Sequence, residues 1–134
     1  MIEGKDGLSK QIVPILASSS NKVLVSWSVN ASSNDHAAML LVRDSTTIYL
    51  GDSAGSRLRC AHGFYGDSQS DMIQTYSGSF LDSPSTTSAT TYYIKGRTPA
   101  SSSHDLYINR SRNDLDRVQN QRTASHITVM EVTV

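Results

Sequence analysis

The chain has 134 residues, of which 23 are Ser and 11 are Thr, and its 12 basic and 12 acidic side chains cancel. A neutral chain carries no overall field that would gather nucleic acid or an anionic membrane, so neither partner is expected. The single cysteine excludes an intrachain disulfide framework, and no apolar run reaches the length of a membrane span.

The first ten residues differ in character from the rest. Residues 1–10 are polar, carry charges of both signs and contain two glycines. They lack the apolar centre of a secretory signal and predict a leader that is flexible or ordered by a partner. Residues 11–134 are long enough to form a single domain with a real core.

The first strands are predicted from alternation. Gln11–Leu16 is a short apolar segment, and Pro14 within it indicates an edge strand. The clearest period of two follows, and it predicts a strand with a buried Trp27 and an inward face of Val23, Val25, Trp27 and Val29. The polar stretch Asn30–His36 is expected to be a loop.

The next segments predict a hairpin and a further strand. Ala38–Arg43 and Thr46–Leu50 are separated by a turn at Asp44-Ser45, and a glycine-rich connection, Gly51–Ser56, follows them. The next strand is expected to place Leu58, Cys60, His62 and Phe64 on one face, so Cys60 and His62 have positional roles in the fold. Arg57 and Arg59 share the other face, where pairing with nearby carboxylates is favoured over an unpaired basic spot.

The stretch Ser77–Arg97 carries the most specific local pattern. The preceding strand has Met72, Gln74, Tyr76, Gly78 and Phe80 on one face. Asp82-Ser83-Pro84 interrupts it, because proline removes a donor and Asp and Ser favour a turn. The apolar pattern resumes at Tyr92–Ile94, which predicts a strand that returns as a hairpin.

The last third of the chain predicts two strands around a charged loop. Leu106 and Ile108 mark a short strand, and Ile127–Val134 is β-branched and is expected to dock in a sheet. Between them, Ser111–Thr123 predicts a long surface loop. Its carboxylates do not follow the spacing of a calcium loop, and the neighbouring Arg112 and Arg117 are expected to neutralise Asp114 and Asp116.

Eight or nine short strands with turns between them predict an all-β fold, an antiparallel β-sandwich of jelly-roll type. The sequence contains no pattern typical of a catalytic or metal-binding site. The four histidines lie in separate segments without zinc spacing, and Gly51–Gly55 lacks the spacing of a serine nucleophile loop. No carboxylate pair stands out for polysaccharide hydrolysis. We therefore expect no enzyme activity, no metal and no cofactor.

Several motifs together resemble a known module. They are Leu41–Ser45, Gly51–Arg57, Phe80–Pro84 and Tyr107–Ser111. From about Gly7 onward the chain is similar to the β-sandwich module at the C-terminal ends of tail-fibre and other virion proteins of bacteriophages, especially aquatic ones. The resemblance implies a jelly-roll-like homotrimer on the outer surface of a virion assembled in the host cytoplasm, with no catalytic residues.

Two functions are compatible with this resemblance. The fibre shaft is missing before the module, which favours a capsid decoration or cement subunit that binds the major capsid protein, with expected contacts at Lys5, Lys10, Arg57 and Arg59. The alternative is the receptor-binding tip of a tail fibre that recognises a host surface glycan. Its expected recognition residues lie in loops: Asn34, Asp35, Tyr65, Asp67, Arg112 and Asp114.

Overall fold

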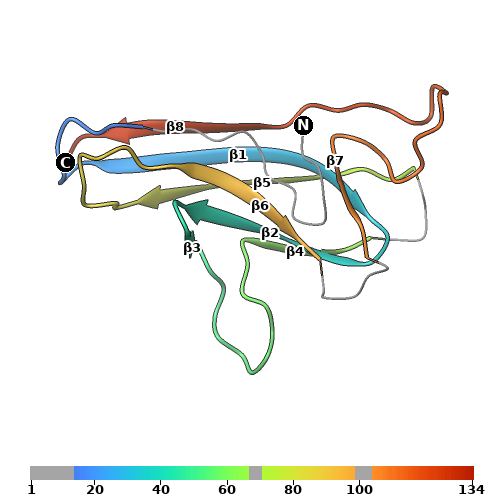
Figure 1. Cartoon of the computed structure of the whole chain (residues 1–134), viewed down its shortest axis with the longest axis horizontal. Helices are drawn as coiled ribbons and strands as arrows, with labels where there is room; N and C mark the ends of the chain where they lie inside the picture. The colour runs from blue at the N-terminus through green and yellow to red at the C-terminus, as the bar shows by residue number, and fades with distance from the viewer. Residues whose placement is uncertain (1–13, 67–70, 99–103) are drawn as a thin grey trace.

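The computed structural model describes residues 14–66, 71–98 and 104–134. Within these ranges eight strands form two antiparallel sheets that pack against each other, and no helix occurs (Figure 1). The predicted all-β sandwich is confirmed, and its jelly-roll connectivity stays a prediction. The leader, with Lys5 and Lys10, lies outside the described residues, as does Asp67.

Each sheet is built around one long central strand. In the first sheet β1 (Lys22–Ser33) pairs on one side with β5 (Gln74–Asp82) and on the other with β7 (Leu106–Ile108) and β8 (His126–Val132). In the second sheet β2 (His36–Arg43) pairs on one side with β6 (Tyr92–Arg97) and on the other with β3 (Thr46–Ile48) and β4 (His62–Tyr65).

The alternation in β1 forms the core as predicted. Its inward side chains Val23, Val25, Trp27 and Val29 are at most 2% exposed. They pack against Met39, Leu41, Tyr92 and Ile94 of the second sheet. Apolar burial on this scale is the main stabilising term of a domain without disulfides. The docking of the last strand is also confirmed, because β8 pairs with β1 over seven residues.

The predicted loop at Asn30–His36 is wrong. β1 continues to Ser33 and β2 begins at His36, so the turn between them is reduced to Asn34 and Asp35. The polar side chains of this part are buried and bonded: Ser32 donates to the Arg110 carbonyl at 2.9 Å and Ser33 to the Asp105 carbonyl at 2.8 Å. A buried hydroxyl with a partner is compatible with a strand, so polarity alone misled the prediction.

The predicted hairpin at Ser77–Arg97 is also wrong in its pairing. Two strands and a polar connection are present, but β5 pairs with β1 and β6 pairs with β2. The connection between them, residues 83–91, therefore crosses from one sheet to the other (Figure 1). The local sequence pattern predicted where the two strands lie. It did not predict their pairing partners, which depend on how the two sheets pack around the core.

Two shorter predictions need correction as well. The described part of the predicted edge strand, Pro14–Leu16, is not in a strand, although Leu16 is buried at 5% exposure. The strand predicted to begin near Leu58 starts only at His62, and Leu58 is 47% exposed. Cys60 and His62 are partly buried, as expected.

A buried polar cluster joins the two sheets at the end opposite the β1–β2 turn. Arg43 Nη1 donates to both carboxylate oxygens of Asp82 at 2.9 and 2.8 Å, and the Tyr92 hydroxyl donates to Asp82 Oδ2 at 2.6 Å. Asp82 is 6% exposed and Tyr92 fully buried, and burial together with the bond to Asp82 raises the pKa of Tyr92. Arg43 and Asp82 lie in two of the motifs on which the predicted resemblance rests, and in the structure they join the two sheets.

Candidate interaction surfaces

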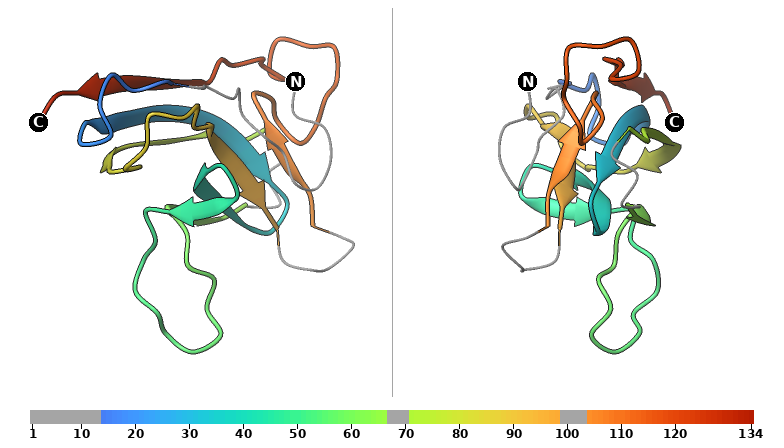
Figure 2. Two further views of the ribbon diagram at one scale, coloured as in Figure 1. Left: turned by 60° about the vertical axis from the view of Figure 1, so that its left-hand side comes forward. Right: turned by 90° about the vertical axis from the view of Figure 1, so that its right-hand side faces the viewer.

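Four connections meet at one end of the sandwich, which we call the loop end. They are the β1–β2 turn and the described parts of the β4–β5, β6–β7 and β7–β8 connections (Figures 1 and 2). Hydrogen bonds tie them together: Asp105 N donates to Asn34 Oδ1 at 2.8 Å, and Gly66 N donates to the Asp35 carbonyl at 2.9 Å. The loop end is therefore a continuous surface built from distant parts of the chain.

Asp35 is the centre of this surface. Its carboxylate lies 2.6 Å from His36 Nδ1 and 2.7 Å from His104 Nε2. The hydrogen bonds from His36, followed by the charge of His104, hold the pKa of Asp35 below its ordinary value. The His36 ring packs edge-on against Tyr65, with ring centroids 4.8 Å apart. An exposed aromatic ring beside polar groups is an arrangement suited to binding a ligand with both polar and apolar faces.

The structure thus brings together three of the predicted recognition residues, Asn34, Asp35 and Tyr65. Tyr65 is 60% exposed. His36 and His104 belong to the same cluster and were missed, because residues 36 and 104 look unrelated along the chain. His36 follows Asp35 in the chain, whereas only the pairing of β1 with β7 brings the His104 imidazole beside the same carboxylate.

Arg112 and Asp114 lie in the long β7–β8 loop, and both are exposed. The predicted partners of the loop carboxylates are wrong for Asp114, which pairs with Arg110 at 3.4 Å and Arg122 at 2.6 Å. The hydrogen bond from Arg122 lowers the pKa of Asp114. Arg117 instead lies 3.5 Å from Asp71 of the β4–β5 connection, which fastens the long loop to its neighbour.

Residues 50–60 of the β3–β4 connection form a second surface, which we call the arm. It projects from the second sheet away from the rest of the sandwich (Figures 1 and 2). Its residues are exposed apart from the partly buried Cys60. At its base the Tyr49 ring packs against Trp27 and Phe80, with centroid separations of 5.7 and 5.2 Å. The arm is therefore anchored at its root and open to solvent along its length.

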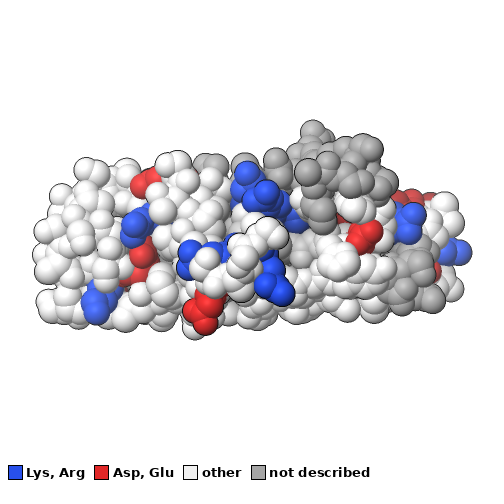
Figure 3. All heavy atoms as spheres, turned by 90° about the horizontal axis from the view of Figure 1, so that it is seen from below, with Lys and Arg blue, Asp and Glu red and all other residues white. Residues whose placement is uncertain are grey.

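Arg57 and Arg59 both lie on the arm and not on a strand. Arg57 Nη1 donates to the Ala54 carbonyl at 3.2 Å, and Arg59 Nε donates to the Gly51 carbonyl at 2.6 Å. No carboxylate of a described residue forms an ion pair with either guanidinium group, so the favoured pairing is wrong within this part of the chain. Figure 3 shows the molecule from below, which is the side toward which the arm projects in Figure 1. Lys and Arg side chains lie at the middle of this side.

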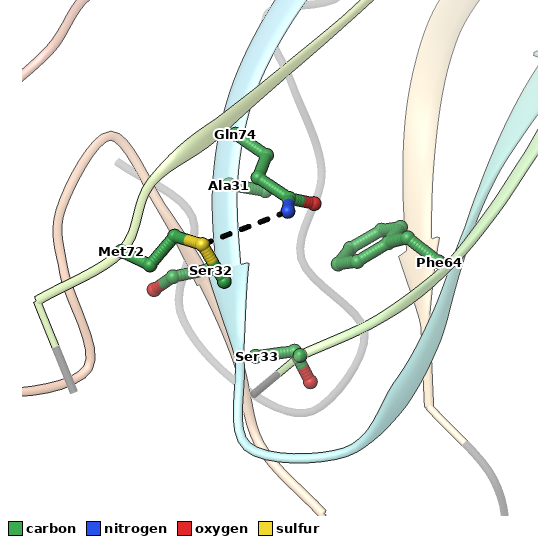
Figure 4. Close-up of a pocket in the computed structure, with 7 residues that line it drawn as sticks. Ala31, Ser32, Ser33, Phe64, Met72 and Gln74 are labelled. Carbon is green, nitrogen blue, oxygen red and sulfur yellow. Dashed lines mark hydrogen bonds between the residues drawn. The ribbon is translucent and has the colours of Figure 1, made fainter. Parts of the chain in front are cut away.

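A small hollow opens between the sheets near the loop end (Figure 4). Ala31, Ser32 and Ser33 line one side, and Phe64, Gly66, Met72 and Gln74 complete it. Its empty volume is about 210 Å³, part of which is open solvent, whereas ligand pockets usually enclose roughly 300–1,000 Å³. A Cβ on Gly66 would lie 1.9 Å from the Ser33 carbonyl oxygen, so glycine permits the close backbone approach here. The hollow is lined by neutral side chains, and none of them is a charged group that could act as an acid, a base or a metal ligand.

Within residues 14–66, 71–98 and 104–134, no group of three or more His, Cys, Asp or Glu side chains is arranged to hold a metal ion. The same residues contain no helix long and apolar enough to cross a membrane. Comparison with protein-family models and with curated protein sequences found no match to this chain.

Proposed function

We propose that this chain is a structural protein of a bacteriophage virion, a capsid decoration subunit that binds the outer surface of the head as a homotrimer. The arm is the observation that supports this proposal. Residues 50–59 are all exposed, Leu58 among them, and the guanidinium groups of Arg57 and Arg59 form no ion pair with a carboxylate of the described residues. The resemblance of the chain to modules of virion proteins is the reason why we propose a virion as the assembly to which it binds.

The arm has the composition of a protein–protein contact. Arginine is enriched at the centres of interfaces, where it combines an apolar stem with several donors. Arg57 and Arg59 each donate one N–H group to a carbonyl of the arm, which restrains the side chain and reduces the entropy that it loses on binding a partner. A trimer repeats each of its surfaces three times, and weak contacts made together on a lattice combine through effective concentration.

One part of the outer face of the first sheet fits a particle exterior. The outward side chains of the first sheet include Ser26, Ser28, Ser77, Ser79 and Thr128, which lie beside one another in the strand register. A neutral, hydroxyl-rich face of this kind keeps a crowded particle surface wetted without attracting charged partners.

The receptor-binding tip of a tail fibre is the second candidate, and the Asp35 cluster favours it. Tyr65 offers an exposed ring of the kind that stacks on the apolar face of a sugar. Asp35 and His36 beside it supply polar atoms. This candidate places the working surface at the loop end and leaves the arm without a role, so we rank it second.

The location and copy number of the protein on purified particles test the proposal. We expect quantitative mass spectrometry to find hundreds of copies per particle, and immunogold labelling to mark the head. A few copies confined to the tail tip would refute decoration and support the receptor-binding tip.

A binding assay with phage heads that lack the protein tests which of its surfaces is needed for binding to the head. The double variant R57A/R59A should lose most of its co-sedimentation with such heads, whereas R112A at the loop end should bind like the unaltered chain. Equal binding by all three proteins would remove the arm from the contact. Circular dichroism would establish that each variant is folded.

A further inference from the structure

The arm carries a short exposed pattern of charge and apolar surface. Leu58 is 47% exposed and stands between Arg57 and Arg59. An exposed leucine flanked by two guanidinium groups fits a partner that offers an apolar contact between carboxylates.

The β7–β8 loop carries the opposite pattern. Leu115 is 53% exposed and stands between Asp114 and Asp116, and Val118 nearby is 89% exposed. Asp116 is exposed and takes part in none of the ion pairs formed among the described residues. Asp114 holds Arg110 and Arg122, but such pairs are exposed and weak, so an incoming guanidinium group can share the carboxylate.

We propose that the arm of one copy binds the β7–β8 loop of a second copy, with Leu58 against Leu115 and the two arginines against Asp114 and Asp116. This inference rests on the proposed function, since it names the partner of the arm within the homotrimer. The charges of the two triplets are opposite in sign and equal in spacing along the chain, because both triplets have the order charged, Leu, charged. The apolar residue at each centre gives the contact a dry middle with a charged rim.

The two triplets cannot meet within one molecule. The arm extends below the sandwich, and the outer part of the β7–β8 loop lies on its upper side (Figures 1 and 2). A contact between two different surfaces of identical chains is head-to-tail, and it closes into a ring when the rotation between neighbours permits. Each copy in such a ring uses its arm once and its loop once.

A disulfide between the two leucine positions tests the contact in the purified protein. The variant L58C/L115C, prepared with C60S to remove the native thiol, is oxidised at micromolar concentration and run on a non-reducing gel. We expect covalent species of three chains or a ladder of linked chains, each of which requires contact between copies. The matched control is L58C/L81C with C60S, because Leu81 is 45% exposed but lies on the first sheet. Monomers alone, or equal yields from both variants, would overturn the inference.

Reversal of one charge pair gives an independent test that depends on sign. R59D and D116R should each weaken self-association by roughly tenfold in sedimentation equilibrium, and the combined variant R59D/D116R should recover most of it. Asp116 is chosen because its replacement disturbs no ion pair of the described loop. Added salt should weaken association of the unaltered chain, since exposed charges are screened. No recovery in the combined variant would overturn the inference.

The inference and the proposed function fail in different ways. A protein found on phage heads whose cysteine variants do not link would overturn the inference alone. Purified chains that link at Leu58 and Leu115 positions, but are absent from heads, would refute decoration and leave the contact intact. An arm that binds heads while the purified chain stays monomeric identifies the capsid as its partner and overturns the inference.

Discussion

Replacement of Asp82 by alanine tests the polar cluster that joins the two sheets. The Asp82 carboxylate accepts from the Arg43 guanidinium group and from the Tyr92 hydroxyl, and it comes from the first sheet while both donors come from the second. D82A removes the common acceptor and leaves two donors facing a small gap.

The loss of unfolding free energy in D82A can be estimated from the solvent exposure of these two donors. The Tyr92 hydroxyl belongs to a fully buried residue, and an unsatisfied buried donor costs about 1–3 kcal/mol. The Arg43 side chain is 26% exposed, so water replaces part of its lost bond and its contribution is nearer 1 kcal/mol. We expect D82A to lower the free energy of unfolding by about 3 kcal/mol, a large share of the stability of a small domain.

Urea unfolding followed by the fluorescence of Trp27, the only tryptophan, measures this loss. Y92F removes one hydroxyl and leaves Asp82 paired with Arg43, so it should cost only about 1 kcal/mol. The control D52A, on the exposed arm, should stay within about 0.5 kcal/mol of the unaltered chain. The reasoning would be refuted if D82A cost less than Y92F, or no more than D52A.

Three further predictions concern the core around Trp27. W27A should cost roughly 3–5 kcal/mol, and a near-neutral result in urea unfolding would contradict its burial at 2% exposure. A Cβ on Gly78 would lie 2.5 Å from the Trp27 ring, so G78A should cost about 1–3 kcal/mol, whereas G63A, with its nearest atom at 3.6 Å, should be nearly neutral; equal effects would contradict the overpacking. Burial lowers the pKa of His62 below its ordinary 6.5, and His62 Nε2 accepts from Trp27 Nε1 at 3.1 Å, which requires a neutral imidazole. The stability that His62 contributes is therefore complete above pH 6.5 and is lost as the pH falls from there to the folded-state pKa, and H62Q should remove this part of the pH dependence of unfolding.

Regular alternation was sufficient to predict the position of most strands. Val23 to Val29 identified the inward face of β1, and the β-branched residues near Ile127 identified β8 as a docked strand. These predictions succeeded because a strand with one buried face repeats every two residues, whatever its partner is.

Partner choice and polar burial could not be predicted in this way. Ser32 and Ser33 looked like loop residues because their acceptors, the carbonyls of Arg110 and Asp105, are 78 and 72 positions away in the chain. The Asp35 cluster and the pairing of Asp114 with Arg122 likewise depend on strand registers that a single sequence does not reveal. Only Gly51–Ser56 of the arm was predicted as a connection, and the projection of the whole arm from the sandwich depends on where β3 and β4 pair.

The pairing of β1 with β8 has a consequence for biosynthesis. β1 is the first described strand of the chain, yet its register joins Lys22 to Val132, near the other end. Contacts this distant in sequence are slow to form, and they cannot form before both strands have left the ribosome. The first sheet is therefore completed only after residue 132 emerges, and until then residues 22–28 of β1 have an unpaired edge. A chaperone that covers apolar strands during synthesis should raise the yield of assembled protein more than one that acts on the released chain.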